Sequence, residues 1–413
     1  MKIAIVGGGA AGMTAAYLLD KVHDVTVFEK APVLGGNIRT LNKNIRCDSL
    51  DHRMTLDNGV IEFQRDNFPN FHKLMHELQV KLEEVQVSSE LFLANGDYYK
   101  STGAIRYGCK TRWEQIFQTL KQTPVMLSYL CILARITFAS QDSLRHRPVS
   151  DYLGNDISAR WLKMLLMYAY SMPYTTIDDF PAEIGMPLLA NSGMFTRWDR
   201  IEGGVYTYIE KILADFRGTI HCAARLEEVT RVATGVQITM LNGEQQHFDK
   251  IIFATTPGQV LNLLKDPSES EIKRFQAWKE NVIDTVIHSD TSIYKNFGVT
   301  YFCEFDLFQN KGNQGCGYNA YLDRLCGIDS HSDTHFSLAY NLQQQIAAEK
   351  VIDTQQHTTP AYNVEAIRYR QEVLETNGEN NTYHAGAYLY DGLHEGAITS
   401  GFMVSDLLGG LRL

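Results

Sequence analysis

The first thirty residues alternate between short apolar runs and one glycine-rich turn. Lys2–Val6 is rich in β-branched residues, which is typical of a strand covered on both faces. Met13–Asp20 has helix-forming composition, and Val25–Phe28 is a second strand-like run. The turn between the first strand and the helix is Gly7–Gly12. The pattern therefore predicts a strand, a tight turn, a helix and a second strand.

Later runs predict further elements. Asn242-Gly243 separates two strand-like runs and predicts a hairpin, and the segment 110–190 is helix-rich by composition. Its Pro124–Ala134 stretch is the longest apolar run, with eleven residues, whereas a membrane span needs about 20. We expect it to form a buried helix. Asp266–Glu271 is acidic and contains Ser and Pro, which predicts a solvated loop.

The chain has 413 residues, so more than one domain is expected. Its net charge of −10 and the lack of a dense Lys/Arg run argue against nucleic-acid binding. Seven dispersed cysteines form no CxxC pair and no zinc spacing. This pattern favours reduced thiols in the cytoplasm and predicts no metal site. With the first strand starting at Lys2, no signal peptide is expected either.

The glycine turn has the spacing G-x-G-x-x-G at Gly7, Gly9 and Gly12. The first glycine permits the tight turn, the second lets the backbone approach a pyrophosphate, and the third allows close helix–strand packing. The start of the helix attracts phosphate through its unpaired N–H groups. Glu29 ends the second strand, where a carboxylate can accept hydrogen bonds from ribose hydroxyls. Together these features predict a dinucleotide site.

A second glycine pair, Gly35-Gly36, follows the acid and has no role in a simple NAD domain. With Asn37 and Arg39 it resembles the extended motif of the amine-oxidase-like flavoproteins, which include monoamine oxidases, protoporphyrinogen oxidase and phytoene desaturases. The resemblance implies FAD. Asn37 stands where many members carry Arg, and we expect Arg39 to replace that phosphate contact. Flavin mutases of UDP-galactopyranose also tolerate Gly-Gly-Asn.

The remaining chain resembles one bacterial branch of this superfamily, the predicted NAD/FAD-binding amine-oxidase-like proteins. The matching segments occur in order along the chain: 55–63, 68–71, 171–173, 180–182, 198–204, 288–290 and 317–325. Near the end, Thr382–Tyr388, Asp391–Ala397 and a helix to Leu408 complete the resemblance. It implies that the terminal helix points its N-terminus at the flavin and stabilises negative charge there. The branch usually has Asp where this chain has Gly396.

The predicted fold is α/β, with a discontinuous Rossmann-type FAD-binding domain and an inserted α+β substrate domain that includes the helix-rich segment. The FAD-binding domain is assigned to 1–75, 200–258 and 376–413, and the substrate-binding domain to 76–199 and 259–375.

The cofactor-binding residues are taken from the motifs and from the resemblance, which also implies that the residue at the Val229 position contacts adenine. They are Gly7, Gly9, Ala10, Ala11, Gly12, Glu29, Lys30, Gly35, Gly36, Asn37, Arg39, Thr40, Asn58, Gly59, Val229, Gly386, His394, Glu395, Gly396 and Ala397. No catalytic residue is assigned. The candidates are Tyr388, Tyr390 and His394, which the resemblance places beside the flavin.

The predicted function is that of an FAD-dependent oxidoreductase that accepts hydride at flavin N5 from an amine or a lipid-like substrate, with oxygen or another acceptor reoxidising the flavin. The apolar middle of the chain favours a hydrophobic substrate. No cysteine follows Cys326, so FAD is expected to be non-covalent. The alternatives are a redox-neutral flavin isomerase of the UDP-sugar mutase type and a non-catalytic dinucleotide-binding module.

Overall fold

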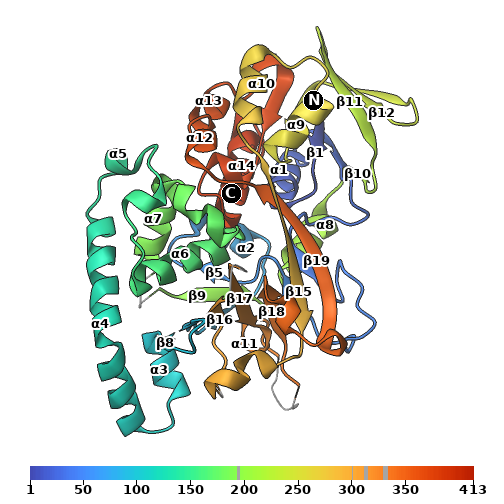
Figure 1. Ribbon diagram of the computed structural model, residues 1–413. Helices are drawn as coiled ribbons and strands as arrows, with labels where there is room; N and C mark the ends of the chain where they lie inside the picture. Colours follow the sequence, from blue (N-terminus) through green and yellow to red (C-terminus); the bar gives the residue numbers. More distant parts are fainter. Residues whose placement is uncertain (193–195, 300, 311–314, 329–333) are drawn as a thin grey trace.

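The computed structural model describes residues 1–192, 196–299, 301–310, 315–328 and 334–413. A five-stranded parallel sheet forms one half of the molecule (Figure 1). Its strands, in spatial order, are β10 (Thr219–His221), β2 (Asp24–Phe28), β1 (Lys2–Val6), β14 (Lys250–Phe253) and β20 (Thr382–His384). Strands from the start, the middle and the end of the chain therefore build one sheet.

Both faces of this sheet are covered, which explains the continuous apolar run in β1. Ile3 and Ile5 pack in a core with helices α1 (Ala10–Leu19), α8 (Tyr206–Asp215) and α14 (His394–Leu407). Ala4 and Val6 pack on the opposite side, with side chains of a three-stranded antiparallel sheet. That sheet comprises β11 (Leu226–Val232), β12 (Gly235–Met240) and β13 (Gln245–Phe248). The predicted Asn242-Gly243 hairpin joins β12 to β13.

A seven-stranded mixed sheet forms the second half. Its spatial order is β19 (Val351–Pro360), β15 (Glu280–His288), β18 (Ser337–Tyr340), β17 (Cys316–Tyr321), β16 (Phe305–Gln309), β7 (Glu90–Phe92) and β8 (Tyr98–Lys100). Short strands connect the two halves: β3 (Arg39–Thr40) with β4 (Asp57–Asn58), and β5 (Phe63–Gln64) and β6 (Leu82–Val85) on either side of β9 (Trp198–Ile201).

The other helices lie around both halves (Figure 1). They are α2 (Pro69–Glu77), α3 (Thr102–Gly108), α4 (Arg112–Thr137), α5 (Gln141–Leu144), α6 (Ile157–Tyr170), α7 (Ala182–Asn191), α9 (Pro257–Leu263), α10 (Glu269–Gln276), α11 (Leu322–Leu325), α12 (Val364–Ile367) and α13 (Arg370–Glu375). The helix-rich segment 110–190 is thus confirmed as α4 to α7. The parallel sheet draws its strands from the three segments assigned to the FAD-binding domain, although the domain boundaries stay a prediction.

The expectation that Pro124–Ala134 is a buried helix is wrong. The run lies in α4, which stands along one edge of the molecule (Figure 1). Only one side of α4 packs against α6 and α7, so Leu127 is 57% exposed and Leu130 47%. Apolar composition identified the helix but could not show that one of its apolar sides lacks a protein neighbour. In the described parts of the chain, no helix is both long and apolar enough to span a membrane.

The expectation of a solvated loop at Asp266–Glu271 is correct for 266–268, whereas helix α10 begins at Glu269. Ser268 caps α10, and its side chain and that of Glu271 exchange hydrogen bonds with each other's backbone N–H. Glu271 is buried and pairs with Arg231. The Ser-x-x-Glu spacing is itself a helix-start signal, so the sequence contained the information.

Candidate functional site

A cavity of about 1370 Å³ lies between the two halves of the molecule. At one end it is lined by the N-terminal glycine turn and Glu29, and at the other by apolar side chains of α4 and α6. Cavities that hold a drug-sized ligand span about 300–1,000 Å³, so this one is large enough for a dinucleotide together with a second molecule.

The two glycine motifs form one cradle at the first end. Gly7 has a φ of +109°, and a Cβ on Gly12 would lie 1.9 Å from the Gly7 oxygen, so helix α1 packs directly on the turn. The Gly35 N–H donates to the Gly8 oxygen at 2.8 Å, and a Cβ on Gly36 would lie 3.0 Å from the Gly9 Cα. Segments 27 residues apart in the chain are thus in direct backbone contact.

Two helix N-termini contribute to the cavity wall. Ala10 and Ala11 line it from the first turn of α1, and His394 and Ala397 from the first turn of α14. Gly401 allows the two helices to lie in close contact. Each N-terminus carries a partial positive charge and unpaired N–H groups, so the pair suits an anionic or electron-rich ligand.

Charged side chains of both signs reach the cradle. The Glu29 carboxylate accepts hydrogen bonds from the N–H groups of Gly8 and Ala31 at 2.7 and 2.8 Å, which fixes it at the cavity wall. Burial lowers the pKa of Arg39, and in the described residues this guanidinium has no ion-pair partner. A carboxylate and a guanidinium therefore lie in the same cradle.

Most of the predicted cofactor-binding residues line this cavity. They are Gly7, Gly9, Ala10, Ala11, Glu29, Lys30, Gly35, Gly36, Asn37, Arg39, Gly59, Gly386, His394 and Ala397. The structure brings them together from four separate segments, and their contacts with a cofactor stay a prediction.

The other predicted cofactor residues have structural partners outside the cavity wall. They are Gly12, Thr40, Asn58, Val229, Glu395 and Gly396. Thr40 donates to Asp57 at 2.5 Å, and the Asn58 oxygen accepts from Thr285 and His357. Val229 is fully buried in the core, and the cavity is lined instead by Ala224–Leu226, a few residues earlier in the chain.

Glu395 holds the start of helix α2. Its two carboxylate oxygens accept the N–H groups of Asn70 and Phe71 at 2.9 and 2.8 Å, although α2 has no side-chain cap of its own. The function of an N-cap is thus supplied from the far end of the chain.

We expect Glu395→Ala to lower the free energy of unfolding by about 2 kcal/mol, because two buried N–H groups lose their acceptor. Urea unfolding measures the change, and Glu349→Ala, at an exposed carboxylate, is the control with little effect. If Glu395→Ala unfolds like the unaltered protein but no longer holds its cofactor, the carboxylate contacts the cofactor instead.

Asp391 lies beside Gly396, the position where the branch usually has Asp. Its Oδ1 accepts the N–H groups of Leu393 and Gly396 at 2.8 and 2.9 Å. A Cβ on Gly396 would lie 2.3 Å from this oxygen, so the site has room only for glycine. Burial raises the pKa of Asp391 to about 6.

The three catalytic candidates are placed differently. Tyr388 and His394 line the cavity, whereas Tyr390 lies outside the lining and its carbonyl accepts from Arg370. His394 lies 3.1 Å from the Tyr208 hydroxyl, and burial lowers its pKa to about 3, so its ring is neutral. A neutral imidazole at a helix start can donate or accept a hydrogen bond but carries no charge.

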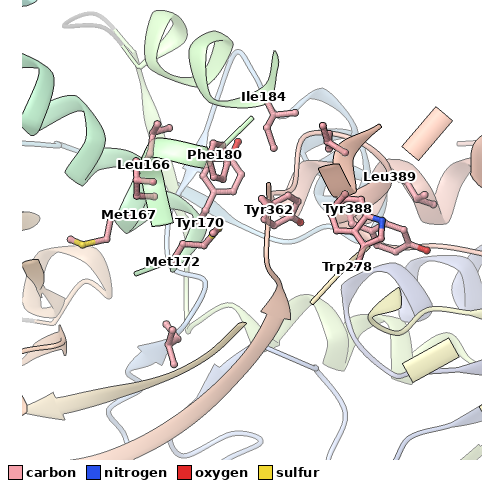
Figure 2. Packing of buried hydrophobic residues seen from close by; sticks show 14 of the residues in the cluster. Leu166, Met167, Tyr170, Met172, Phe180, Ile184, Trp278, Tyr362, Tyr388 and Leu389 are labelled. Carbon is pink, nitrogen blue, oxygen red and sulfur yellow. The ribbon is translucent and has the colours of Figure 1, made fainter. Parts of the chain in front are cut away.

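Tyr388 belongs to an aromatic group that the sequence did not indicate. Figure 2 shows Tyr170, Tyr362 and Tyr388 in a row beside Trp278. The rings of Tyr170 and Tyr362 lie 5.6 Å apart, and Trp278 meets Tyr362 at 5.8 Å and Tyr388 at 5.3 Å. The phenols of Tyr170 and Tyr362 donate to carbonyls of Asp391 and Gly392. The aromatic row therefore fixes the loop before α14.

A carboxyl–phenol pair in the cavity was also missed. The Tyr168 hydroxyl donates to Glu62 at 2.8 Å, and both residues line the cavity. Burial raises the pKa of Glu62 to about 7, although the hydrogen bond from Tyr168 acts in the opposite direction. Near neutral pH, Glu62 can therefore accept or release a proton. A charged residue inside the apolar run Val60–Phe63 was the signal available in the sequence.

Several polar atoms at the cavity wall have no hydrogen-bond partner in the described structure. They are Thr256 Oγ1, His357 Nδ1 and Tyr388 Oη. Buried polar atoms are normally paired. These three are inaccessible although the cavity is open, so they lie within its wall and do not identify a ligand. Among the described residues, no group of three or more His, Cys, Asp or Glu side chains is suited to a metal ion.

Comparison with known proteins agrees with this geometry. Residues 5–78 match the family described as an NAD(P)-binding Rossmann-like domain. An uncharacterized protein of Methanocaldococcus jannaschii is 54% identical over 41 residues, which is 10% of this chain and 10% of that protein.

Solved structures are similar over nearly the whole chain. A putrescine oxidase bound to putrescine has a TM-score of 0.68 at 14% identity, covering 99% of both chains. Cyclohexylamine oxidase from Brevibacterium oxydans has a TM-score of 0.69 at 10% identity, and the similarity also covers 99% of both chains. A fatty acid isomerase from P. acnes that produces CLA has a TM-score of 0.68 at 16% identity, and the similarity covers 98% of both chains. The predicted α/β class is confirmed, and the chain has the fold of the amine-oxidase-like flavoproteins, built on an N-terminal NAD(P)-binding Rossmann-like domain.

Proposed function

We propose that this protein is an FAD-dependent oxidoreductase that acts on a long apolar substrate. The observation that carries the proposal is the continuity of the cavity. The same space that begins at the glycine cradle ends among Val125, Met126, Tyr129 and Leu133 of α4 and Trp161 and Leu165 of α6. A small polar amine does not require such an extension.

The residues at the cradle fit a non-covalent FAD. Gly9 and Gly36 leave room for a pyrophosphate, Arg39 and Lys30 offer cations, and Glu29 offers a ribose acceptor. The start of α14 lies at the same wall, where a helix N-terminus stabilises negative charge on the ring system. None of the seven cysteines is among the lining residues, so a thioether link to the flavin has no donor there.

When bound, the flavin supplies a hydride acceptor at N5. Glu62 is suited to take the accompanying proton, since its carboxyl is half ionised near pH 7 and faces the cavity. As hydride leaves one carbon and Glu62 removes the proton from its neighbour, the electrons of that second C–H bond form a C=C bond. Tyr168 holds the carboxylate in place. Oxygen or another two-electron acceptor then restores the cofactor.

A chain-length series tests the substrate class. Under anaerobic conditions, we expect long acyl compounds to bleach the flavin spectrum, whereas putrescine and cyclohexylamine do not. Bleaching by the short amines alone would contradict the apolar substrate and favour an amine oxidase.

A redox-neutral isomerase is the second candidate, favoured by the fatty acid isomerase that shares this fold. Glu62 could return its proton to a different carbon of the same chain. Turnover without any electron acceptor would identify this activity. The oxidoreductase instead requires an acceptor for every turnover.

A further inference from the structure

Helix α4 exposes an apolar stripe that no described part of the chain covers. Large apolar side chains are exposed at Trp113, Ile116, Phe117, Leu120, Leu127 and Leu130, and at Phe138 directly after the helix. Trp113 is 81% exposed and Phe138 88%. These seven are almost half of the fifteen exposed large apolar side chains in the described structure. Their spacing of three, four and seven residues places them along one side of the helix, which is about 39 Å long.

The surroundings of the stripe are basic, although the protein is acidic. Residues 101–150 contain seven Lys or Arg and two Asp or Glu, a net charge of +5, so a chain of net charge −10 carries −15 elsewhere. All seven basic side chains are exposed: Arg106, Lys110, Arg112, Lys121, Arg135, Arg145 and Arg147. In the described structure only Arg147 of these has an ion pair, with Asp151.

The other side of α4 is a wall of the cavity. Val125, Met126, Tyr129 and Leu133 line it, and Leu130 both lines the cavity and is 47% exposed. Arg106 and Tyr107 at the end of α3 are likewise lining residues with exposed side chains. The cavity therefore reaches the surface beside the stripe.

We infer that α4 docks the protein on an anionic lipid surface, with the stripe among the acyl chains and the basic residues at the headgroups. An exposed helix with Trp, Phe and Leu on one side and Lys and Arg beside them has the composition of an interfacial helix. Each basic residue near an anionic bilayer adds attraction, whereas the acidic remainder of the protein is repelled, which sets the orientation. The helix lies in the interface and does not cross it.

A second copy of the chain fits this surface less well. In a symmetric pair the same patch of each protomer would meet, so two sets of unpaired basic side chains would face each other. A bilayer instead supplies apolar and anionic groups together. Passage of an apolar substrate from the bilayer past Leu130 into the cavity follows only if the proposed function is correct; docking itself does not depend on it.

Trp113 gives a direct readout. It is the exposed member of four tryptophans, since Trp161 and Trp278 are buried and Trp198 is half-buried. The purified full chain is mixed with vesicles of phosphatidylcholine alone and with vesicles containing about a third phosphatidylglycerol. We expect co-sedimentation and a blue shift of tryptophan emission with the anionic vesicles, and loss of the shift in Trp113→Phe.

The triple variant Phe117→Ser, Leu120→Ser, Leu127→Ser is expected to bind the anionic vesicles at least about tenfold more weakly. A matched triple change at exposed apolar positions elsewhere, Val22→Ser, Val282→Ser and Leu407→Ser, keeps full binding. The inference is overturned if the unaltered chain does not bind the anionic vesicles, or if the first triple variant binds them as well as the unaltered chain does. It is also overturned if the unaltered chain self-associates and this variant does not. If a detergent-dispersed substrate bleaches the flavin but the protein does not bind vesicles, docking alone is refuted. If the protein binds vesicles but no acyl compound bleaches the flavin, only the proposed function is refuted.

Discussion

Replacing Gly9 with valine is expected to yield a folded protein that has lost its flavin. Gly9 has a φ of −81° and a ψ of −170°, a conformation that valine adopts readily. An added Cβ would lie 3.6 Å from its nearest neighbour, the Gly36 Cα, which is ordinary contact. The valine methyl groups then occupy the cavity wall beside the two glycine segments, where the pyrophosphate is proposed to lie.

We expect Gly9→Val to weaken FAD binding by about 100-fold or more, because the methyl groups overlap the phosphate position. The flavin absorbance per protein and the urea unfolding curve are measured on the same sample. Gly154→Val, at a glycine where an added Cβ would meet only Asp156 Oδ2 at 3.8 Å, is the matched control that keeps its flavin. Gly12→Val provides the contrast: its Cβ would lie 1.9 Å from the Gly7 oxygen, so it should lower stability itself. Full flavin content in Gly9→Val would place the cofactor elsewhere.

Replacing Glu62 with glutamine is the second change with a large expected effect. Glutamine keeps the size of the side chain but cannot accept a proton. We expect kcat/KM to fall by about 100- to 10,000-fold, the usual contribution of a positioned general base, while the flavin stays bound. Glu84→Gln is the matched control, because Glu84 also lines the cavity but is largely exposed and pairs with Arg65.

The pH profile separates a base from a structural carboxylate. Glu62 acts as a base when ionised, and burial raises its pKa to about 7, so kcat/KM should rise with pH and level off above about 7. Tyr168→Phe removes a hydrogen bond that favours the ionised form, which moves this rise to higher pH. Glu62→Gln should lack the rise. If kcat/KM of Glu62→Gln still rises with pH in the same way, the rise belongs to another titrating group.

The sequence was most informative where the chemistry is local. The turn, helix and acid of the first thirty residues follow one another along the chain, and the structure places Gly7, Gly9 and Glu29 at one cavity. The strand–helix order predicted there needs only neighbouring residues. The N-terminus of α14 was also located, because a glycine-containing loop before a helix is a local signal.

Contacts between distant segments could not be predicted from one sequence. Glu62 and Tyr168 are 106 residues apart, and Glu395 reaches the start of α2 across 325 residues. Glu395 was therefore predicted to bind the cofactor from its place in the motif alone, without knowledge of its contact with α2. Composition predicted a helix at Pro124–Ala134, but whether its sides meet protein depends on the packing of α6 and α7. The side chain of Val229 lies in the core, and the contact with adenine that the resemblance implies for this position stays a prediction.

The cavity between the two halves is proposed to hold a flavin dinucleotide without a covalent bond. The visible spectrum of the purified protein, followed by acid precipitation, decides this. We expect a yellow protein whose colour moves entirely to the supernatant and whose released cofactor has the mass of FAD. A colourless protein that takes up no added FAD, or one that releases NAD in its place, would contradict it.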